Sequence, residues 1–185
     1  LDVKQIAGKS IPEYYTFGKV SRGCLDTIAG IRKPTIAAVF GFVLGGALEL
    51  ALACDLRIAT PDAKLGCPEI NLGIIPGSGG TQRMPRLIGI GKAKELLFSG
   101  DSVSGEEALR IGLVNKIAPK ENLLAEAKAW AQKLAAKPRV AMTLLKHSID
   151  HGMDMDLDSA LTFETDCFVQ AYVSEDGREG FQAFI

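Results

Sequence analysis

The sequence lacks an excess of either charge. It contains 21 lysines and arginines against 22 aspartates and glutamates, which gives a formal net charge of -1. A chain without a surplus of basic residues has no general electrostatic attraction to nucleic acid or to an acidic membrane surface. We therefore expect neither of them as a partner.

Cysteines are few, and none of them forms a CxxC motif. The four thiols are Cys24, Cys54, Cys67 and Cys167. Their spacing matches neither a set of zinc ligands nor a disulfide framework. This pattern indicates a reducing compartment, so we expect a cytoplasmic protein without a metal centre.

A long hydrophobic run is also missing. Glu49 and Asp55 interrupt the longest apolar segment before it reaches the roughly 18 residues of a membrane span. What the chain does have is an ordinary globular composition, with 47% hydrophobic and 23% charged residues over a length of 185. Such a chain can bury a substantial core, and we expect a globular protein that is not inserted in a membrane.

The order of strand and helix signals is typical of an α/β fold. Short runs rich in β-branched residues at 35–40 and 56–60 predict buried strands, and a helix is predicted between them at 45–53. We find no internal repeat. After residue 122 the pattern becomes almost purely helical, which predicts a core over 1–122 and a helical C-terminal region over 123–185.

Apolar residues at helical spacing predict further helices on both sides of residue 122. Glycine and proline mark most of their ends, and the Ser-x-x-Glu pattern at Ser104 and Glu107 predicts a capping box. The predicted helices cover residues 14–31, 81–87, 92–99, 104–111, 123–136, 139–151 and 157–172.

One acidic residue stands out within an apolar helix. Glu49 lies in the segment GFVLGGALELALACD (41–55), shortly after the pair Gly45 and Gly46. A glycine pair that opens a helix leaves main-chain N–H groups accessible, so an anion such as an enolate oxygen could bind there. The alternative is that Glu49 faces solvent or is neutralised by an arginine such as Arg57, which is the commoner situation for a single glutamate.

A second isolated acid strengthens the case for chemistry. Glu69 lies in LGCPEINLGIIPG, again between apolar or small residues. Alone it would be interpreted as a surface-turn acid. Two such acids, each beside a glycine-rich turn, favour paired acid–base catalysis, in which one group removes a proton and the other supplies one.

Other functional classes receive weaker support. His147 and His151 have helical i, i+4 spacing, but the glutamate of HExxH is absent, so we interpret them as surface histidines and not as zinc ligands. Ser78 in PGSGG does not fit the GxSxG pattern of serine hydrolases. GIIPGSGGT lacks the lysine of a phosphate-binding loop, and GIGKAK lacks the third glycine of a dinucleotide fingerprint.

An ordered series of segments resembles the enoyl-CoA hydratase (crotonase) family. The segments are KPTIAAVFGFVLGGALELALACDLRIA, LGCPEINLGIIPGSGGTQRMPRLIG, KAKELLFSGD and GEEALRIGLVNKI, and the resemblance runs over residues 1–185. It implies an α/β fold, the ClpP-like spiral of ββα units. It also implies a helical C-terminal trimerisation region, in a homotrimer or a hexamer built as a dimer of trimers.

The resemblance also implies a set of site residues. Glu49 and Glu69 match the two hydratase glutamates, and Gly46 matches the glycine whose N–H forms half of the oxyanion hole. The other half would come from Leu1, which precedes Asp2 in a segment similar to the family's Gly-Ala-Asp. Val3, Lys4 and Gly77 are expected beside the substrate. The sequence departs from the family at Ala47, usually glycine, and at Cys67, often glutamine.

The implied reaction is the reversible syn addition of water to the C2–C3 double bond of a 2-enoyl-CoA, giving 3-hydroxyacyl-CoA, as in fatty-acid β-oxidation. Glu49 would activate the water, and Glu69 would deliver the proton to C2. No cofactor is expected, because coenzyme A is part of the substrate. An isomerase, another acyl-CoA enzyme of the family and an inactive structural member remain alternatives. Compared with the family, sequence is absent at both ends, so we expect a longer natural chain.

Overall fold

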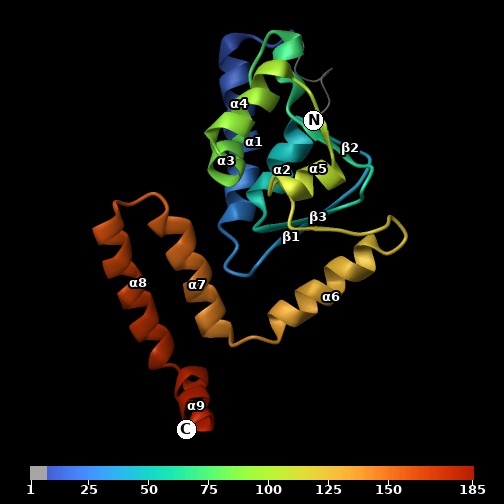
Figure 1. Cartoon of the computed structure of the whole chain (residues 1–185). Helices are drawn as coiled ribbons and strands as arrows, with labels where there is room; N and C mark the ends of the chain where they lie inside the picture. Colours follow the sequence, from blue (N-terminus) through green and yellow to red (C-terminus); the bar gives the residue numbers. More distant parts are fainter. Residues whose placement is uncertain (1–7) are drawn as a thin grey trace. The chain divides into compact units, whose positions relative to one another are not determined.

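The computed structural model describes residues 8–185 and is shown in Figure 1. The site predictions for Leu1, Asp2, Val3 and Lys4 lie outside the described residues. The chain divides into two compact units, which we describe separately. The first contains the described residues up to Gly30 together with Thr35–Lys128, and the second contains Ile31–Pro34 and Ala129–Ile185.

Two small sheets form the framework of the first unit. In one sheet, all neighbouring strands are parallel; in the other, β2 and β4 are parallel and β4 and β5 are antiparallel. The first sheet has the order β1 (Ile36–Val39), β3 (Leu56–Ala59) and β6 (Lys116–Ile117), and the second has the order β2 (Phe42–Leu44), β4 (Lys64–Gly66) and β5 (Val103–Ser104).

The strands repeat as a spiral. The sequence β1, β2 and helix α2 (Gly46–Ala53) is followed by β3, β4 and the 3-10 helix η2 (Pro68–Leu72). Since β1 pairs with β3 and β2 pairs with β4, each pair of strands stacks on the preceding pair. The result agrees with the predicted spiral of ββα units, although the repeat cannot be seen in the sequence.

Four further helices of the first unit are α1 (Ile11–Ala29), α3 (Gly80–Ile88), α4 (Ile90–Ser99) and α5 (Gly105–Arg110). Helix α2 lies in contact with both α1 and α3, and α3 packs on α4 (Figure 1). The core is apolar and closely packed. Its fully buried members include Leu48, Ala59, Leu65, Met84, Ala93 and Leu113. Helix α2 is therefore a central element, and its orientation is set from several sides.

The predicted capping box is only half formed. The Ser104 hydroxyl accepts a hydrogen bond from the Glu107 N–H at 3.1 Å, as expected. The Glu107 carboxylate, however, binds Arg110 at 2.6 Å instead of returning to the cap. The reciprocal interaction occurs at α1, where the Ser10 N–H donates to Glu13 at 2.9 Å.

The second unit is helical. Helix α6 (Leu123–Ala135) starts in the first unit and ends in the second, followed by α7 (Arg139–Gly152), α8 (Leu157–Tyr172) and α9 (Glu175–Phe184). Helices α7 and α8 pack along each other. Helix α9 was not predicted, and it contacts α8 through the rings of Tyr172 and Phe181 at 5.0 Å. Within residues 8–185, no helix has the length and apolarity needed to cross a membrane.

A buried arginine fixes the C-terminal end of α2. Arg57 on β3 is only 3% exposed, and its Nη1 donates to the carbonyls of Cys54 at 2.7 Å and Ala51 at 3.3 Å. Its Nε donates to the Leu113 carbonyl at 2.9 Å. The last carbonyls of a helix have no intrahelical partner, and Arg57 supplies one. Burial lowers the pKa of the guanidinium, and the neighbouring Cys54 and Asp55 oppose that shift.

We predict that Arg57→Met destabilises the protein by about 3 kcal/mol or more, because it leaves several buried carbonyls without a donor. Urea denaturation measures this change. Arg110→Met is the matched control, since Arg110 is exposed and pairs with Glu107 at the surface. Equal shifts in the midpoints of the two variants would contradict the structural role of Arg57.

Candidate active site

Parallel strand pairing brings two distant turns together. Leu44 at the end of β2 lies opposite Gly66 at the end of β4, so the residues that follow start at the same edge of the sheet. The Gly45 N–H donates to the Gly66 carbonyl at 2.9 Å and closes this edge. The glycine turn that opens α2 and the segment that carries Glu69 are therefore neighbours.

Glu69 lies directly against this glycine turn. A Cβ atom on Gly45 would be 2.8 Å from Glu69 Oε1, and Gly45 has a φ of +55°, so a side chain at position 45 would be excluded by both space and backbone. The next residue, Gly46, is the first of α2. Its N–H belongs to the first helical turn, where donors have no intrahelical acceptor. The predicted oxyanion donor, the Gly46 N–H, and the predicted acid, Glu69, thus lie at the same turn.

Glu49 is held by main-chain donors. Its side chain is buried, with 3% exposure, and Oε1 accepts hydrogen bonds from the Ser78 N–H at 2.7 Å and the Gly80 N–H at 2.9 Å. Gly80 begins α3, so the positive end of that helix dipole faces the carboxylate. The alternatives of a solvent-facing Glu49 and of an Arg57 partner are wrong, because Glu49 is buried and the Arg57 guanidinium donates to carbonyls.

Gly80 makes this approach possible. A Cβ on Gly80 would lie 2.9 Å from Pro76 Cβ, 3.2 Å from Cys67 Sγ and 3.3 Å from Glu49 Oε1. The first of these separations is shorter than real Cβ atoms adopt, and the other two are tight. The Glu49 carboxylate can therefore approach the Gly80 N–H only because position 80 has no side chain.

The two carboxyl groups influence each other. Burial raises the pKa of Glu69, a hydrogen bond with its own main chain opposes this shift, and the charge of Glu49 adds to it. Glu69 Oε2 is buried and has no hydrogen-bond partner among residues 8–185. An unsatisfied buried oxygen of this kind is rare in folded proteins. It marks a place where water or substrate can bind.

The negative charges of Glu69 and Glu49 both act on the Cys67 thiol. Burial, then the charge of Glu69, then that of Glu49, raise the pKa of the thiol well above its usual range. The thiol is therefore protonated at neutral pH and is a poor nucleophile. A Cβ at position 80 would touch both Cys67 Sγ and Glu49 Oε1, so the thiol lies near the Glu49 carboxylate.

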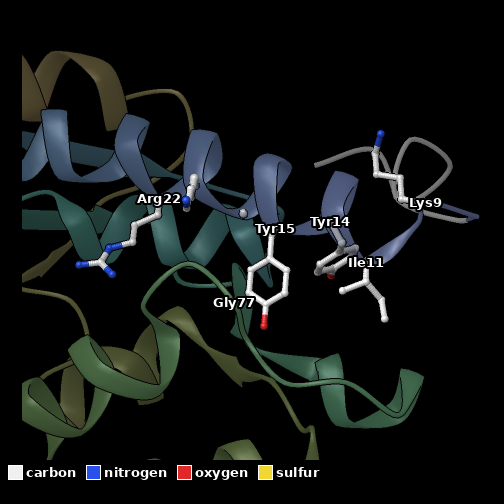
Figure 2. A pocket seen from close by; sticks show the side chains of 8 residues that line it. Lys9, Ile11, Tyr14, Tyr15, Arg22 and Gly77 are labelled. Carbon is white, nitrogen blue, oxygen red and sulfur yellow. The ribbon is translucent and has the colours of Figure 1, made fainter.

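A pocket of about 720 Å³ lies along α1 and the loop before α3 (Figure 2). Figure 2 shows Tyr15 extending toward the segment with Gly77, whereas Arg22 extends away from the tyrosines. The volume falls within the range of small-molecule sites. The lining residues are Lys9, Ile11, Tyr14, Tyr15, Gly18, Lys19, Arg22 and Gly77. Apart from Gly77, none was predicted, although the adjacent Tyr14 and Tyr15 at the start of the predicted 14–31 helix were a usable signal.

Ser78, His147 and His151 make contacts that differ from those of a serine nucleophile or of zinc ligands. The Ser78 hydroxyl shares a hydrogen bond of 2.9 Å with the Ser21 hydroxyl, so it is engaged by another serine. The rings of His147 and His151 lie 4.4 Å apart, and His147 packs on Phe163. In the part of the chain that the structure describes, no group of three or more potential ligands could hold a metal ion.

Comparisons with known proteins agree with this geometry. The family model described as Enoyl-CoA hydratase/isomerase matches residues 1–185. The chain is 45% identical to crotonyl-CoA hydratase of Syntrophomonas wolfei and 42% identical to short-chain-enoyl-CoA hydratase of Clostridium acetobutylicum. In both cases the match includes all of this chain and about 70% of the relative, namely 71% and 70%. The chain belongs to the enoyl-CoA hydratase/isomerase family.

Solved structures give the same result for the fold. The crystal structure of an enoyl-CoA hydratase from Bacillus anthracis matches with a TM-score of 0.94 and 40% identity, over 99% of this chain and 71% of that one. A second structure, from Geobacillus kaustophilus, matches with a TM-score of 0.95 and 36% identity, over 99% and 70%. The predicted family and the predicted crotonase spiral are both confirmed.

The raised pKa of Glu69 leads to a prediction about stability. Because the folded state holds the Glu69 proton more tightly than the unfolded chain, wild-type stability falls as pH rises from the ordinary value of 4.5 through the raised value. Glu69→Gln cannot lose a proton. We predict that its stability relative to wild type increases over this pH window and that the difference between the two becomes constant at lower pH.

Urea denaturation at several pH values measures this effect. Glu107→Gln is the control with the opposite sign, since the Arg110 guanidinium lowers the pKa of Glu107. That variant should lose stability relative to wild type above the ordinary glutamate pKa. The same trend in both variants would refute the assignment for Glu69.

Proposed function

We propose that the protein is an enoyl-CoA hydratase, a lyase that adds water reversibly and syn across the C2–C3 double bond of a 2-enoyl-CoA. The product is a 3-hydroxyacyl-CoA. The observation that carries this proposal is the convergence of two carboxyl groups beside the N-terminus of α2: Glu49 is buried, and Glu69 is half-buried with its Oε2 atom inaccessible to solvent. The names of the two relatives above, which act on crotonyl-CoA and short-chain enoyl-CoA, support the same substrate class.

Gly46 supplies the electrophilic part of the mechanism. Its N–H in the first turn of α2 donates to the thioester oxygen, and the helix dipole favours the negative charge that develops there. One such donor is worth a factor of about 10²–10³ in rate. The second donor, the N–H of Leu1 before Asp2, stays a prediction from the family resemblance.

Glu49 activates the water. Both main-chain hydrogen bonds fall on Oε1, which fixes the plane of the carboxylate and leaves Oε2 for the water molecule. As the water oxygen bonds to C3, its proton passes to Glu49. The electrons of the C2–C3 bond move toward the thioester, and the negative charge collects on the oxygen bound by Gly46.

Glu69 completes the addition. Its raised pKa favours the protonated form, and Oε2 has no other partner among the described residues, so the carboxyl group can donate to C2. When C2 takes this proton, the enolate returns to a thioester. Reversal uses the same groups in opposite roles. Syn addition requires both groups to act on the same face of the double bond, and we propose that Glu49 and Glu69 do so.

The pocket along α1 fits part of an acyl-CoA. It combines the tyrosine rings and Ile11 with the basic side chains of Lys9, Lys19 and Arg22, and it reaches the loop at Gly77. Apolar and aromatic groups suit an acyl chain or an adenine ring, and the basic groups suit phosphates. We propose no cofactor besides the coenzyme A of the substrate.

A hydratase is favoured over an isomerase of the same family by the second acid. Moving a double bond along an acyl chain needs one acid–base group, whereas adding water needs one group at C3 and another at C2. Here Glu49 is buried, Glu69 is half-buried, and the charge of Glu49 contributes to the raised pKa of Glu69. The experiments below therefore measure the isomerase reaction as well as hydration.

We predict that Glu49→Gln and Glu69→Gln each lower kcat for crotonyl-CoA hydration by about 10²–10⁴-fold, since each removes one proton-transfer group. The absorbance of the conjugated thioester follows the reaction. Glu106→Gln, at an exposed position of α5, is the control and should keep wild-type turnover. Near wild-type hydration by either active-site variant removes that residue from the mechanism.

The same variants should be tested on a 3-enoyl-CoA. Faster turnover of this substrate than of crotonyl-CoA by the wild type, with one glutamate dispensable, would assign the protein as an isomerase. Loss of both reactions in Glu69→Gln together with the stability gain predicted above would show that inactivity does not arise from unfolding.

We infer that the protein forms a homotrimer, or a hexamer of two trimers, through its helical second unit. Large apolar side chains stay exposed along α8, among them Leu157 at 72%, Leu161 at 51% and Phe168 at 59%. Their spacing places them on one helical face. Exposed apolar stripes of this kind mark protein interfaces. We also propose a cytoplasmic location, which the four free thiols support.

We predict a molar mass of three or six chains by light scattering. The double variant Leu161→Lys/Phe168→Lys should shift the distribution toward monomer, because it places charge in the apolar stripe. Gln170→Lys, on a different and exposed face of α8, is the control. A monomeric wild type, or equal masses for both variants, would contradict the proposed interface.

A further inference from the structure

Ser78 connects Glu49 to its surroundings through all of its polar groups. Its N–H donates to Glu49 Oε1 at 2.7 Å, and its carbonyl accepts from Arg83 Nη1 at 3.0 Å. Its hydroxyl shares a hydrogen bond of 2.9 Å with Ser21 on α1. Ser78 is also buried, with 8% exposure. The residue that orients Glu49 is therefore itself fixed from two further directions.

Arg83 is the charged member of this network. It lies one turn into α3, and its guanidinium reaches back over Gly79, where a Cβ atom would collide with Nη1. Nη2 forms an ion pair with Asp26 Oδ1 on α1 at 3.2 Å. One planar side chain thus holds the carbonyl of Ser78 and joins this loop to α1.

The loop needs such an anchor because its backbone is permissive. Gly77, Gly79 and Gly80 surround Ser78, and glycine gives little steric resistance to rotation of a peptide unit. A hydrogen bond from a charged donor is stronger than one between neutral groups. Arg83 therefore favours the loop conformation in which the N–H groups of Ser78 and Gly80 point at the same carboxylate oxygen.

We propose that Arg83 is a positioning residue for Glu49. It acts through the main chain of Ser78 and touches neither of the two carboxyl groups in the hydrogen bonds of the described residues. In its absence the loop rotates, Glu49 loses a donor, and the carboxylate no longer presents Oε2 to the water. The catalytic readout of this proposal rests on the hydratase function proposed above.

The network also reaches the pocket along α1. Asp26 binds Arg83 through Oδ1 and Arg22 through Oδ2, the latter at 3.1 Å, and Arg22 lines the pocket. Ser21 on the same helix binds the Ser78 hydroxyl. A continuous path of hydrogen bonds therefore runs from the pocket wall through Asp26, Arg83 and Ser78 to Glu49.

The first test compares a reaction that needs both Glu49 and Glu69 with a reaction that needs only Glu69. Hydration of crotonyl-CoA needs both groups, whereas exchange of the C2 hydrogen of butyryl-CoA with D2O needs the acid at C2 and the oxyanion donors but no water at C3. We expect Arg83→Met to lower kcat for hydration by about 10–100-fold, the effect of a misplaced catalytic group, with little change in KM. The exchange rate should remain near wild type.

Two further variants complete the comparison. Arg83→Lys keeps a cationic donor near the Ser78 carbonyl and should recover part of the lost hydration. In a Glu49→Gln background, Arg83→Met should cause no additional loss, because the group that it positions is already gone. Arg86→Met, in the last turn of the same helix, is the control and should retain wild-type rates. Equal losses in hydration and in exchange, or an additional loss in the Glu49→Gln background, overturn the proposal.

A second test needs no catalytic activity. Hydrogen–deuterium exchange of the 73–80 segment, followed by mass spectrometry, reports on the N–H groups of Ser78 and Gly80. Arg83→Met should accelerate exchange in this segment, and Arg83→Lys should do so less. Unchanged exchange overturns the proposal. If the wild type fails to hydrate crotonyl-CoA but the segment responds as expected, the proposed function fails and the positioning role of Arg83 stands.

Discussion

The parallel pairing of β2 with β4 is the constraint on which the rest of the structure depends. It aligns Leu44 with Gly66 and lets the Gly45 N–H bind the Gly66 carbonyl. Two segments that are distant in the chain then leave the sheet at the same edge, one as the first turn of α2 and the other as the 3-10 helix with Glu69. Main-chain hydrogen bonds, and not side chains, bring the two candidate catalytic segments together.

At this edge of the sheet, the carboxyl groups of Glu49 and Glu69 lie in different environments. Glu49 is buried and obtains two main-chain donors at the start of α3, whereas Glu69 is half-buried and has one oxygen without a partner among the described residues. Such a difference is what allows two carboxyl groups to act as base and as acid in one site. An unsatisfied buried oxygen destabilises a fold by about 1–3 kcal/mol, so part of the stability is exchanged for a place where substrate or water can bind.

Much of this arrangement could be predicted from residues with strong signals. A glutamate inside an apolar helix is conspicuous, and the bounds of α8 follow from its cap at Asp156 and its apolar spacing. The donors to Glu49 could not be predicted, because the N–H groups of Ser78 and Gly80 carry no residue-specific signature. The spiral was equally invisible in the residues alone, since the strand ladder defines its repeat. Helix α9 was missed because its sequence, EDGREGFQAF, is polar and contains two glycines.

The thiols of this protein differ in a way that is useful for chemical labelling. Of the four cysteines, all within the described residues, Cys24 alone is exposed, and it lies on α1, the helix that lines the pocket. Cys67 is buried, and burial together with the charges of Glu69 and Glu49 strongly raises the pKa of its thiol. A maleimide therefore reacts at Cys24 and spares Cys67. A fluorophore can in this way be attached to α1, the helix that carries most residues of the pocket lining, while the thiol near Glu49 and Glu69 stays unmodified.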